Sequence, residues 1–264
     1  MIQIMGIVNA TPDSFSDGGE HDEPDAAIDH GRTLAACGAT ILDVGGESTR
    51  PGSVPVGIDE ELRRALPVVE HLAADGSVVS IDTYRATTAA RAIEAGAQIV
   101  NDVSGGLADD DMLRVVADAG VEILIGHWRG PSADMYAFAE YDNVGREVAR
   151  ELSARVDAAI AAGIDPSKII LDPGVGFAKA GRQNWSVLRE LGEVTELGFR
   201  VLIGTSRKRF LSSAIGDDAS RDRRDLATAV TSVLAQRAGA WGVRVHDVTS
   251  TRDALAVTDD WDRP

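Results

Sequence analysis

Eight short apolar segments recur along this chain of 264 residues, and segments with helical spacing of apolar residues lie between them. Val and Ile dominate the apolar segments, so we expect β-strands at residues 2–8, 41–44, 78–81, 98–100, 122–125, 169–171, 201–203 and 242–245. Between them, patterns such as 60–74 and 144–162 predict helices. This alternation predicts an α/β fold of a single domain, a (β/α)8 TIM barrel over residues 1–264. No G-x-G-x-x-G follows the first strand, which removes the main support for a dinucleotide-binding sheet.

Polar side chains follow the predicted strands, nearly always at the same end. Asn9, Asp82, Asn101 and Asp172 each stand at or just after the carboxyl end of an apolar run. Active sites of (β/α)8 barrels are built at this end of the barrel. We therefore expect these side chains to converge on one site.

The last two strands end in clusters of cations and small donors. Residues 203–210 read Ile-Gly-Thr-Ser-Arg-Lys-Arg-Phe, and residues 242–248 read Gly-Val-Arg-Val-His-Asp-Val. Phosphate commonly binds in the loops after strands seven and eight of such barrels. The chain has only three lysines, Lys168, Lys179 and Lys208, and its net charge is −16, so these clusters are unusual within it. They predict a local binding site for a polyanion.

Composition excludes several classes of partner and location. A strongly acidic surface repels nucleic acid and anionic membranes, so we expect neither as a partner. No apolar run approaches the roughly 18 residues that a membrane helix needs, and no signal peptide is recognisable. The single Cys37 cannot form an intramolecular disulfide, and its helical setting predicts a small buried thiol. Together these features predict a cytoplasmic protein.

The combination of motifs resembles the dihydropteroate synthase family along nearly the whole chain. The resemblance rests on segments 5–19, 43–52, 80–83, 101–106, 171–179, 205–210 and 244–248, in that order. It departs from the family's pattern at Ala10, where Val is usual, and at Trp128, where Met is frequent. The family is a (β/α)8 barrel that joins 7,8-dihydropterin-6-ylmethyl diphosphate to p-aminobenzoate in folate biosynthesis and releases diphosphate. The resemblance therefore implies a transferase with these two small-molecule substrates.

The resemblance assigns the pterin to a set of polar residues. Asp172 would accept two hydrogen bonds from the pterin N–H and amino group, and Asn101 offers a neighbouring donor and acceptor. Lys208 would donate to the carbonyl side of the ring, and Asp82 would lie beside the ring and stabilise positive charge. With Arg244, Asp82 and Lys208 would form the catalytic set. Taken singly, Asp82 and Asp172 also fit helix N-capping after a strand.

The resemblance also implies where the diphosphate lies. Asn9, Thr49, Arg50, Arg244 and His246 match the family's phosphate positions. Arginine binds phosphate in bidentate fashion. Diphosphate leaves readily only when its charge is neutralised, so we expect Mg²⁺ as cofactor, with Asn9 as its protein ligand.

The p-aminobenzoate slot is expected between two loops that follow the first two strands. Phe15, Thr49 and Pro51 would pack on the aromatic ring. Its carboxylate would meet Ser206 and Arg209 at the start of the helix after strand seven. Sulfonamides mimic this ring and its negative end, so the resemblance implies a sulfonamide target.

Two other interpretations stay open at this point. A pterin-dependent methyltransferase would share the Asp–Asn–Asp pocket, but a methyl donor carries no diphosphate to explain the cationic clusters. A catalytically inactive paralogue could bind pterin without turnover. The family usually forms homodimers through late helices, so the helix expected at 224–238 and the apolar Leu255, Val257 and Trp261 are candidates for an interface.

Overall fold

The computed structural model describes residues 2–11, 23–48, 55–131 and 136–263 of the chain. Strands and helices alternate within these residues. The strands are β1 (Gln3–Asn9), β2 (Ile41–Gly45), β3 (Val79–Asp82), β4 (Ile99–Asp102), β5 (Glu122–Gly126), β6 (Ile169–Asp172), β7 (Arg200–Ile203) and β8 (Gly242–Val245). The helices are α1 (Glu23–Cys37), α2 (Ile58–Ala74), α3 (Ala86–Glu94), α4 (Met112–Ala119), α5 (Val144–Ala161), α6 (Gln183–Arg189), α7 (Gly192–Thr195), α8 (Ser212–Ile215), α9 (Arg221–Arg237) and α10 (Val248–Trp261). Two 3-10 helices, η2 (Pro166–Lys168) and η3 (Arg209–Leu211), complete the order.

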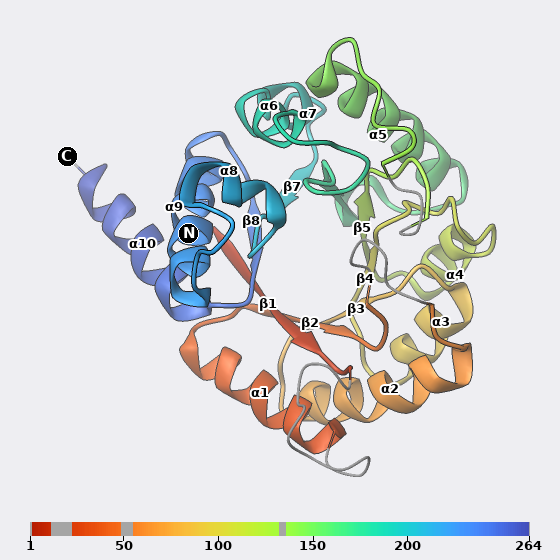
Figure 1. Ribbon diagram of the computed structural model, residues 1–264. Helices are drawn as coiled ribbons and strands as arrows, with labels where there is room; N and C mark the ends of the chain where they lie inside the picture. Colours follow the sequence, from red (N-terminus) through yellow and green to blue (C-terminus); the bar gives the residue numbers. More distant parts are fainter. Residues whose placement is uncertain (1, 12–22, 49–54, 132–135, 264) are drawn as a thin grey trace.

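The eight strands form a closed barrel in which each strand is parallel to its neighbours. β1 pairs with β2 and with β8, which closes the ring, and the helices follow one another around the outside (Figure 1). This confirms the predicted (β/α)8 fold. Each predicted strand is present, but several continue further than expected. Asn9, Asp82, Asn101 and Asp172 are therefore the last or nearly the last residues of their strands and are held by strand pairing.

The barrel interior is layered along its axis. One layer is an apolar cluster of six side chains from different strands: Met5, Ile41, Ile99, Leu124, Ile170 and Leu202. Side chains alternate along a strand, so residues two positions further on face the interior again. Two positions on from five of these six residues the side chain is polar or absent, at Asp43, Asn101, Gly126, Asp172 and Gly204, whereas β1 places the apolar Ile7 there. The apolar layer closes the barrel below, and the polar layer faces its carboxyl-terminal mouth.

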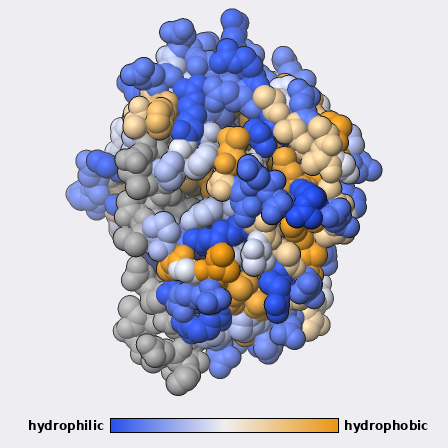
Figure 2. All heavy atoms as spheres, turned by 90° about the vertical axis from the view of Figure 1, so that its right-hand side faces the viewer, coloured by the Kyte–Doolittle hydropathy of each residue, from blue (hydrophilic) through white to orange (hydrophobic). Residues whose placement is uncertain are grey.

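The outside of the barrel is covered by helices and by a largely hydrophilic surface. On the side where α3, α4 and α5 lie, hydrophilic side chains cover most of the face, and hydrophobic residues form smaller groups between them (Figure 2). Within the described residues, no helix combines the length and the apolar character needed to cross a membrane. Cys37 ends α1 as expected and packs against the core, but the residue is only partly buried.

Candidate active site

One cavity at the carboxyl-terminal mouth of the barrel brings together five of the predicted site residues. Asp82, Asn101, Asp172, Lys208 and Arg244 all line it, together with Val103, Gly126, Gly174, Phe177 and Gly204. A side chain at Gly204 would lie 3.7 Å from Lys208 Nζ and 3.8 Å from Asp172 Oδ2. The absence of a side chain there leaves the space between these two charged groups open to a ligand.

Arg244 is fixed by two carboxylates from neighbouring strands. Its Nε donates to Asp43 Oδ2 at 2.6 Å, and its terminal nitrogen donates to Asp82 Oδ2 at 2.7 Å. Asn101 Nδ2 donates to the same Asp43 oxygen at 3.0 Å. Burial opposes the charge of Arg244, but Asp43 and Asp82 raise its pKa above the usual value. Arg244 is therefore a fixed cation that keeps further N–H donors for an anion.

Asp43 was not predicted as a site residue, although the resemblance included its segment. Its side chain is fully buried at the centre of the site, and its Oδ1 has no hydrogen-bond partner within the described part of the chain. A polar residue in the middle of β2, rather than at its end, was the available signal. Charged residues are almost never fully buried unless they are paired, so a buried Asp within a strand already indicates a partner.

Asp172 and Lys208 face each other across the cavity. Asp172 Oδ1 accepts from the Gly174 N–H at 2.8 Å, and burial raises the pKa of this carboxyl although the Lys208 charge opposes the shift. Lys208 Nζ donates to the Val175 carbonyl and lies 4.7 Å from the centre of the Phe177 ring. Burial lowers the pKa of Lys208 to about 8. A carboxylate and an ammonium group on two sides of the cavity can hydrogen-bond the edges of a planar ring.

The Asp82 carboxyl interacts electrostatically with several charged groups. Burial raises its pKa to about 7, although the Arg244 cation opposes this shift. Asp43, Glu61 and Asp102 add to the increase because they are acidic as well. Asp102 itself accepts three hydrogen bonds from its own loop, from Ser104 N at 2.8 Å, Ser104 Oγ at 2.7 Å and Gly106 N at 2.6 Å. Asp102 is therefore a structural residue that holds the loop after β4.

The predicted diphosphate side lies next to the cavity. Asn9 ends β1 beside Gly45, and His246 follows β8 directly. His246 Nδ1 lies 2.8 Å from Ser206 Oγ, and the backbone N–H of His246 donates to the same hydroxyl at 3.0 Å. Ser206 is therefore bound to His246, and Arg209 is exposed at the start of η3. Phe15, Thr49, Arg50 and Pro51 lie outside the described residues.

The connection after β7 differs from the sequence-based expectation in two ways. The predicted helix near 206–209 is a 3-10 turn at 209–211 followed by the four-residue α8, so there is no long helix to receive a carboxylate. The Arg207 guanidinium forms two bonds to Asp225 of α9, at 2.6 and 2.8 Å, and does not line the cavity. Arg207 therefore makes a structural contact, whereas Lys208 lines the cavity.

Comparison with known proteins identifies this arrangement. The family model described as pterin binding enzyme matches residues 5–246. The chain belongs to the pterin-binding enzyme family. It is 51% identical over 265 residues to the dihydropteroate synthase of Mycobacterium leprae, and this match covers 98% of this chain and 93% of that protein. It is similar to the Xanthomonas albilineans dihydropteroate synthase solved with 4-aminobenzoic acid, with a TM-score of 0.93, 43% identity, and 100% and 94% of the two chains covered.

A second Xanthomonas albilineans structure, solved in complex with 7,8-dihydropteroate, has a TM-score of 0.89 and 40% identity, and the match covers 100% of this chain and 95% of that one. The predicted family is therefore confirmed.

A buried polar network supports the loop after β6 in this pterin-binding enzyme. Lys179 is 1% exposed, and its Nζ lies 2.9 Å from His127 Nδ1, 3.1 Å from the Gly174 carbonyl and 3.0 Å from the Phe177 carbonyl. Burial lowers the pKa of Lys179 to about 7. Gly174 and Phe177 line the cavity, so Lys179 holds the wall of the site from behind.

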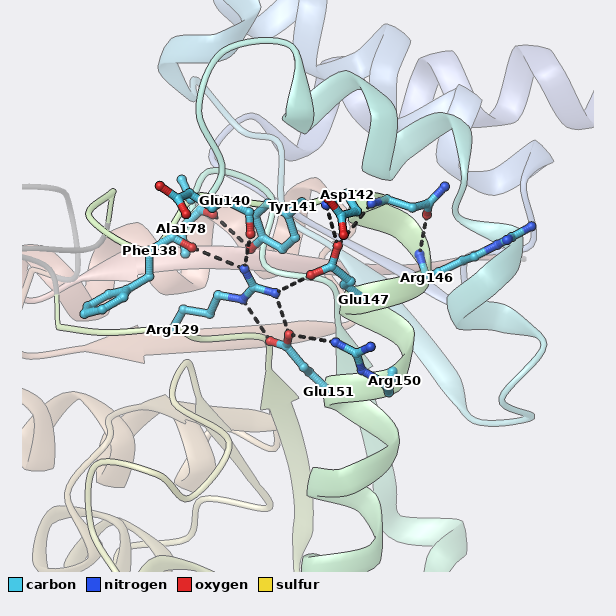
Figure 3. Close-up of polar contacts among 12 residues, drawn as sticks. Arg129, Phe138, Glu140, Tyr141, Asp142, Arg146, Glu147, Arg150, Glu151 and Ala178 are labelled. Carbon is cyan, nitrogen blue, oxygen red and sulfur yellow. Dashed lines mark hydrogen bonds and ion pairs between the residues drawn. The ribbon is translucent and has the colours of Figure 1, made fainter.

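The network continues through His127 to the surface. His127 Nε2 lies 2.9 Å from Glu151 Oε2, and Arg129 binds both Glu151 and Glu147. Figure 3 shows the Arg129 side chain extended between the carboxylates of α5 and the carbonyls of Phe138 and Glu140. His127 and Arg129 lie directly after β5, whereas Lys179 lies in the loop after β6 and carries no local sign of this role. Its partners are up to 52 residues away in the chain, so no local pattern reveals them.

The described residues contain no group of three or more His, Cys, Asp or Glu side chains that could hold a metal ion. Asn9, at the end of β1, offers an amide oxygen, which is a hard ligand of the kind that Mg²⁺ prefers. A single amide oxygen fits an ion that is carried mainly by a phosphorylated substrate and its waters, since Mg²⁺ commonly keeps several waters.

Proposed function

We propose that this chain catalyses the reaction of dihydropteroate synthase. It would condense 7,8-dihydropterin-6-ylmethyl diphosphate with p-aminobenzoate to form 7,8-dihydropteroate and diphosphate. The observation that carries this proposal is the convergence of Asp82, Asn101, Asp172, Lys208 and Arg244 on one cavity. Relatives of the family that were solved with 4-aminobenzoic acid and with 7,8-dihydropteroate support the same pair of substrates.

The pterin would bind between Asp172 and Lys208. The Asp172 carboxylate accepts from the ring N–H and amino group, which is a charge-assisted pair of bonds, and Lys208 donates to the ring carbonyl. Asn101 completes recognition of the same edge, since its Nδ2 already donates to Asp43 and its oxygen remains available as an acceptor. A ring held by both edges is oriented with its exocyclic methylene towards Arg244.

The diphosphate would meet Arg244, His246 and Asn9, with Thr49 and Arg50 reaching it from the loop after β2. Asn9 would hold Mg²⁺, which would neutralise part of the charge that develops on the leaving group. The C–O bond between the methylene and the diphosphate breaks, and its electron pair leaves with the diphosphate. Arg244 stabilises this charge as a fixed cation, because two carboxylates have already oriented it.

The pterin methylene then carries positive charge that the ring delocalises, and Asp82 stabilises it from beside the ring. The amine nitrogen of p-aminobenzoate forms the new C–N bond and releases one proton. This sequence requires no covalent intermediate on the protein. Phe15, Thr49, Pro51, Ser206 and Arg209 are proposed to form the p-aminobenzoate slot, and sulfonamides should compete for it.

The Arg244 cation at the cavity favours this reaction over the alternatives. A pterin-dependent methyltransferase has no diphosphate for Arg244 to neutralise or for His246 to bind. An inactive relative would bind pterin without turnover. The test is incubation of the purified chain with both substrates and Mg²⁺, with product and diphosphate measured together. Equal amounts of dihydropteroate and diphosphate are expected, whereas pterin binding without either product would contradict the proposed activity.

Assembly and location extend the proposal. We propose that the chain acts as one domain over residues 1–264 and forms a homodimer through α9 and α10. Leu226, Val230 and Leu234 recur every four residues on α9 and are 64%, 52% and 57% exposed, and Val257 and Trp261 are exposed on α10. Leu255 is buried and belongs to the core instead. A cytoplasmic location remains the expectation, because the substrates are small metabolites and the chain offers a single cysteine.

A further inference from the structure

Arg207 adopts a backbone conformation that side chains other than glycine rarely take. Its φ is +57°, and among the described residues other than glycine only Ala178 shares a positive φ. A left-handed residue with a Cβ persists only when its surroundings hold it there, and such residues cluster at functional sites. Arg207 stands between Ser206, which binds His246, and Lys208, which lines the cavity.

The surroundings that hold Arg207 come from one face of α9. Asp225 accepts two bonds from the guanidinium, at 2.6 and 2.8 Å, and is itself 7% exposed. Thr228 Oγ1 accepts from the Arg207 backbone N–H at 3.1 Å. Thr231 Oγ1 lies 2.8 Å from Thr205 Oγ1, so the residues of α9 at 225, 228 and 231 contact three successive points of the same turn.

Successive side chains of this turn, at residues 207 and 208, point in different directions. Arg207 points towards α9, and Lys208 points into the cavity, where Nζ binds the Val175 carbonyl and faces Phe177. Lys208 follows directly on the left-handed residue, so a change in φ at residue 207 would rotate the backbone that carries it. A shift of about 1 Å at a recognition group can cost two orders of magnitude in rate.

We propose that Arg207 is a positioning residue, whose bidentate bond to Asp225 holds the turn after β7 and thereby places Lys208 in the pterin pocket. The role of Lys208 in pterin recognition rests on the proposed function. In this account Arg207 contacts neither substrate, in contrast to the polyanion role that its sequence context suggests.

The test compares substitutions at the two ends of this bond. Arg207→Ala and Asp225→Asn should each weaken binding of 6-hydroxymethyl-7,8-dihydropterin, which lacks the diphosphate, by about tenfold in calorimetry. Arg207→Gly should recover part of the affinity lost in Arg207→Ala, because glycine adopts a positive φ without strain. Thermal unfolding confirms that each variant is folded.

Arg200→Ala is the matched control. Arg200 begins β7, the strand that leads to the turn at Arg207, and so lies at the opposite end of the barrel; it forms an ion pair with Glu122 and has the same 28% side-chain exposure as Arg207. Its substitution should leave pterin affinity unchanged. A crystal structure of Arg207→Ala provides a readout independent of affinity, and Lys208 Nζ should have left the Val175 carbonyl.

Three results would overturn the inference. One is a folded Arg207→Ala variant with wild-type pterin affinity and Lys208 still on Val175. Another is an Arg207→Ala variant that loses affinity only for the diphosphate substrate while Asp225→Asn keeps wild-type affinity. That result would make Arg207 a direct contact of the anion. The third is equal pterin loss in the Arg200→Ala control. A wild-type chain that binds pterin but forms no product would contradict the proposed function and leave this inference standing.

Discussion

At the scale of residues, the site depends on charged groups that are held in place before any substrate arrives. Asp43 and Asp82 orient Arg244, and Lys179 with His127 supports the loop that carries Gly174 and Phe177. A preoriented donor costs no reorganisation when charge develops on the leaving group. Most of these groups are buried, so their protonation affects the stability of the fold as well as catalysis.

His127 should make stability depend on acidity. Burial, and next the Lys179 charge, lower the pKa of His127 to about 4, so the native imidazole stays neutral while the unfolded one protonates below about pH 6.5. The stabilisation is fully present above pH 6.5 and is lost as pH falls towards 4. At about 1.4 kcal/mol per pKa unit, the loss approaches about 3 kcal/mol.

Urea unfolding of the wild type and of His127→Gln at pH 7, 5.5 and 4.5 measures this effect. The stability advantage of the wild type should shrink steadily as pH falls, because Gln does not titrate. His71→Gln, at an exposed position, controls for the loss of a histidine in general. An advantage that stays constant from pH 7 to 4.5 would show that the imidazole is not held neutral by its surroundings.

At the scale of elements, the connections at the mouth of the barrel are tied down at their bases. Arg85, at the start of α3, binds Glu61 of α2, and its terminal nitrogen also reaches Glu47 Oε2 at 2.8 Å and the Val56 carbonyl at 2.9 Å. Glu47 Oε2 accepts from the Val56 N–H at 2.7 Å as well. Both ends of the connection between β2 and α2 are thus joined, and this connection carries Thr49, Arg50 and Pro51.

Substitution of Arg85 should be costly because it leaves two buried carboxylates without their cation. Glu61 and Glu47 are 1% and 8% exposed, so Arg85→Met should lower the free energy of unfolding by about 3 kcal/mol or more. Arg91→Met, in the exposed pair with Glu94 on the same helix, should change it by less than about 1 kcal/mol. Chemical denaturation gives both values, and similar losses in the two variants would rule out a special role for Arg85.

The sequence predicts the eight strands and five cavity residues because both have local signals. Ile169-Ile170-Leu171 is an apolar run, and the charged Asp172 follows it directly. A charged residue in this place indicates that the strand ends there, either at the surface or in a functional site. Asp43 lacks this signal because it lies within β2, and its partner Arg244 is 201 residues away. The turn at Arg207 is likewise held by Asp225 of a later helix. The local sequence therefore could not show that a turn stands where a helix was expected at 206–209.

At the scale of the whole molecule, a strongly acidic protein places two cations, Lys208 and Arg244, in the cavity at the mouth of its barrel. The net charge is −16, yet Lys208 and Arg244 both face the cavity. Asp82 and Asp172 line the same cavity, so it offers paired charges of both signs to a small polar ligand, while the acidic surface around it disfavours nucleic acid. The apolar stripe on α9 and α10 lies outside the barrel and remains available for assembly.

Val230→Glu should convert the proposed homodimer into a monomer. Val230 is 52% exposed at the centre of the stripe formed by Leu226, Val230 and Leu234, and in a two-fold dimer a new carboxylate there would be buried without a partner. Sedimentation velocity at micromolar concentration measures the change. Leu107→Glu, at a similarly exposed position after β4, is the control and should stay dimeric. A wild type that sediments as a monomer would contradict the proposed interface.

The most direct test of the account is pterin binding to the wild type and to Asp172→Asn. The substitution places a donor opposite the donors of the pterin edge and removes a charge-assisted pair of bonds, together worth about 3 kcal/mol or more. Calorimetry should show that the folded variant loses at least about a hundredfold in pterin affinity, while its unfolding temperature stays close to that of the wild type. Unchanged pterin affinity in a folded Asp172→Asn variant would show that the pterin does not bind in this cavity.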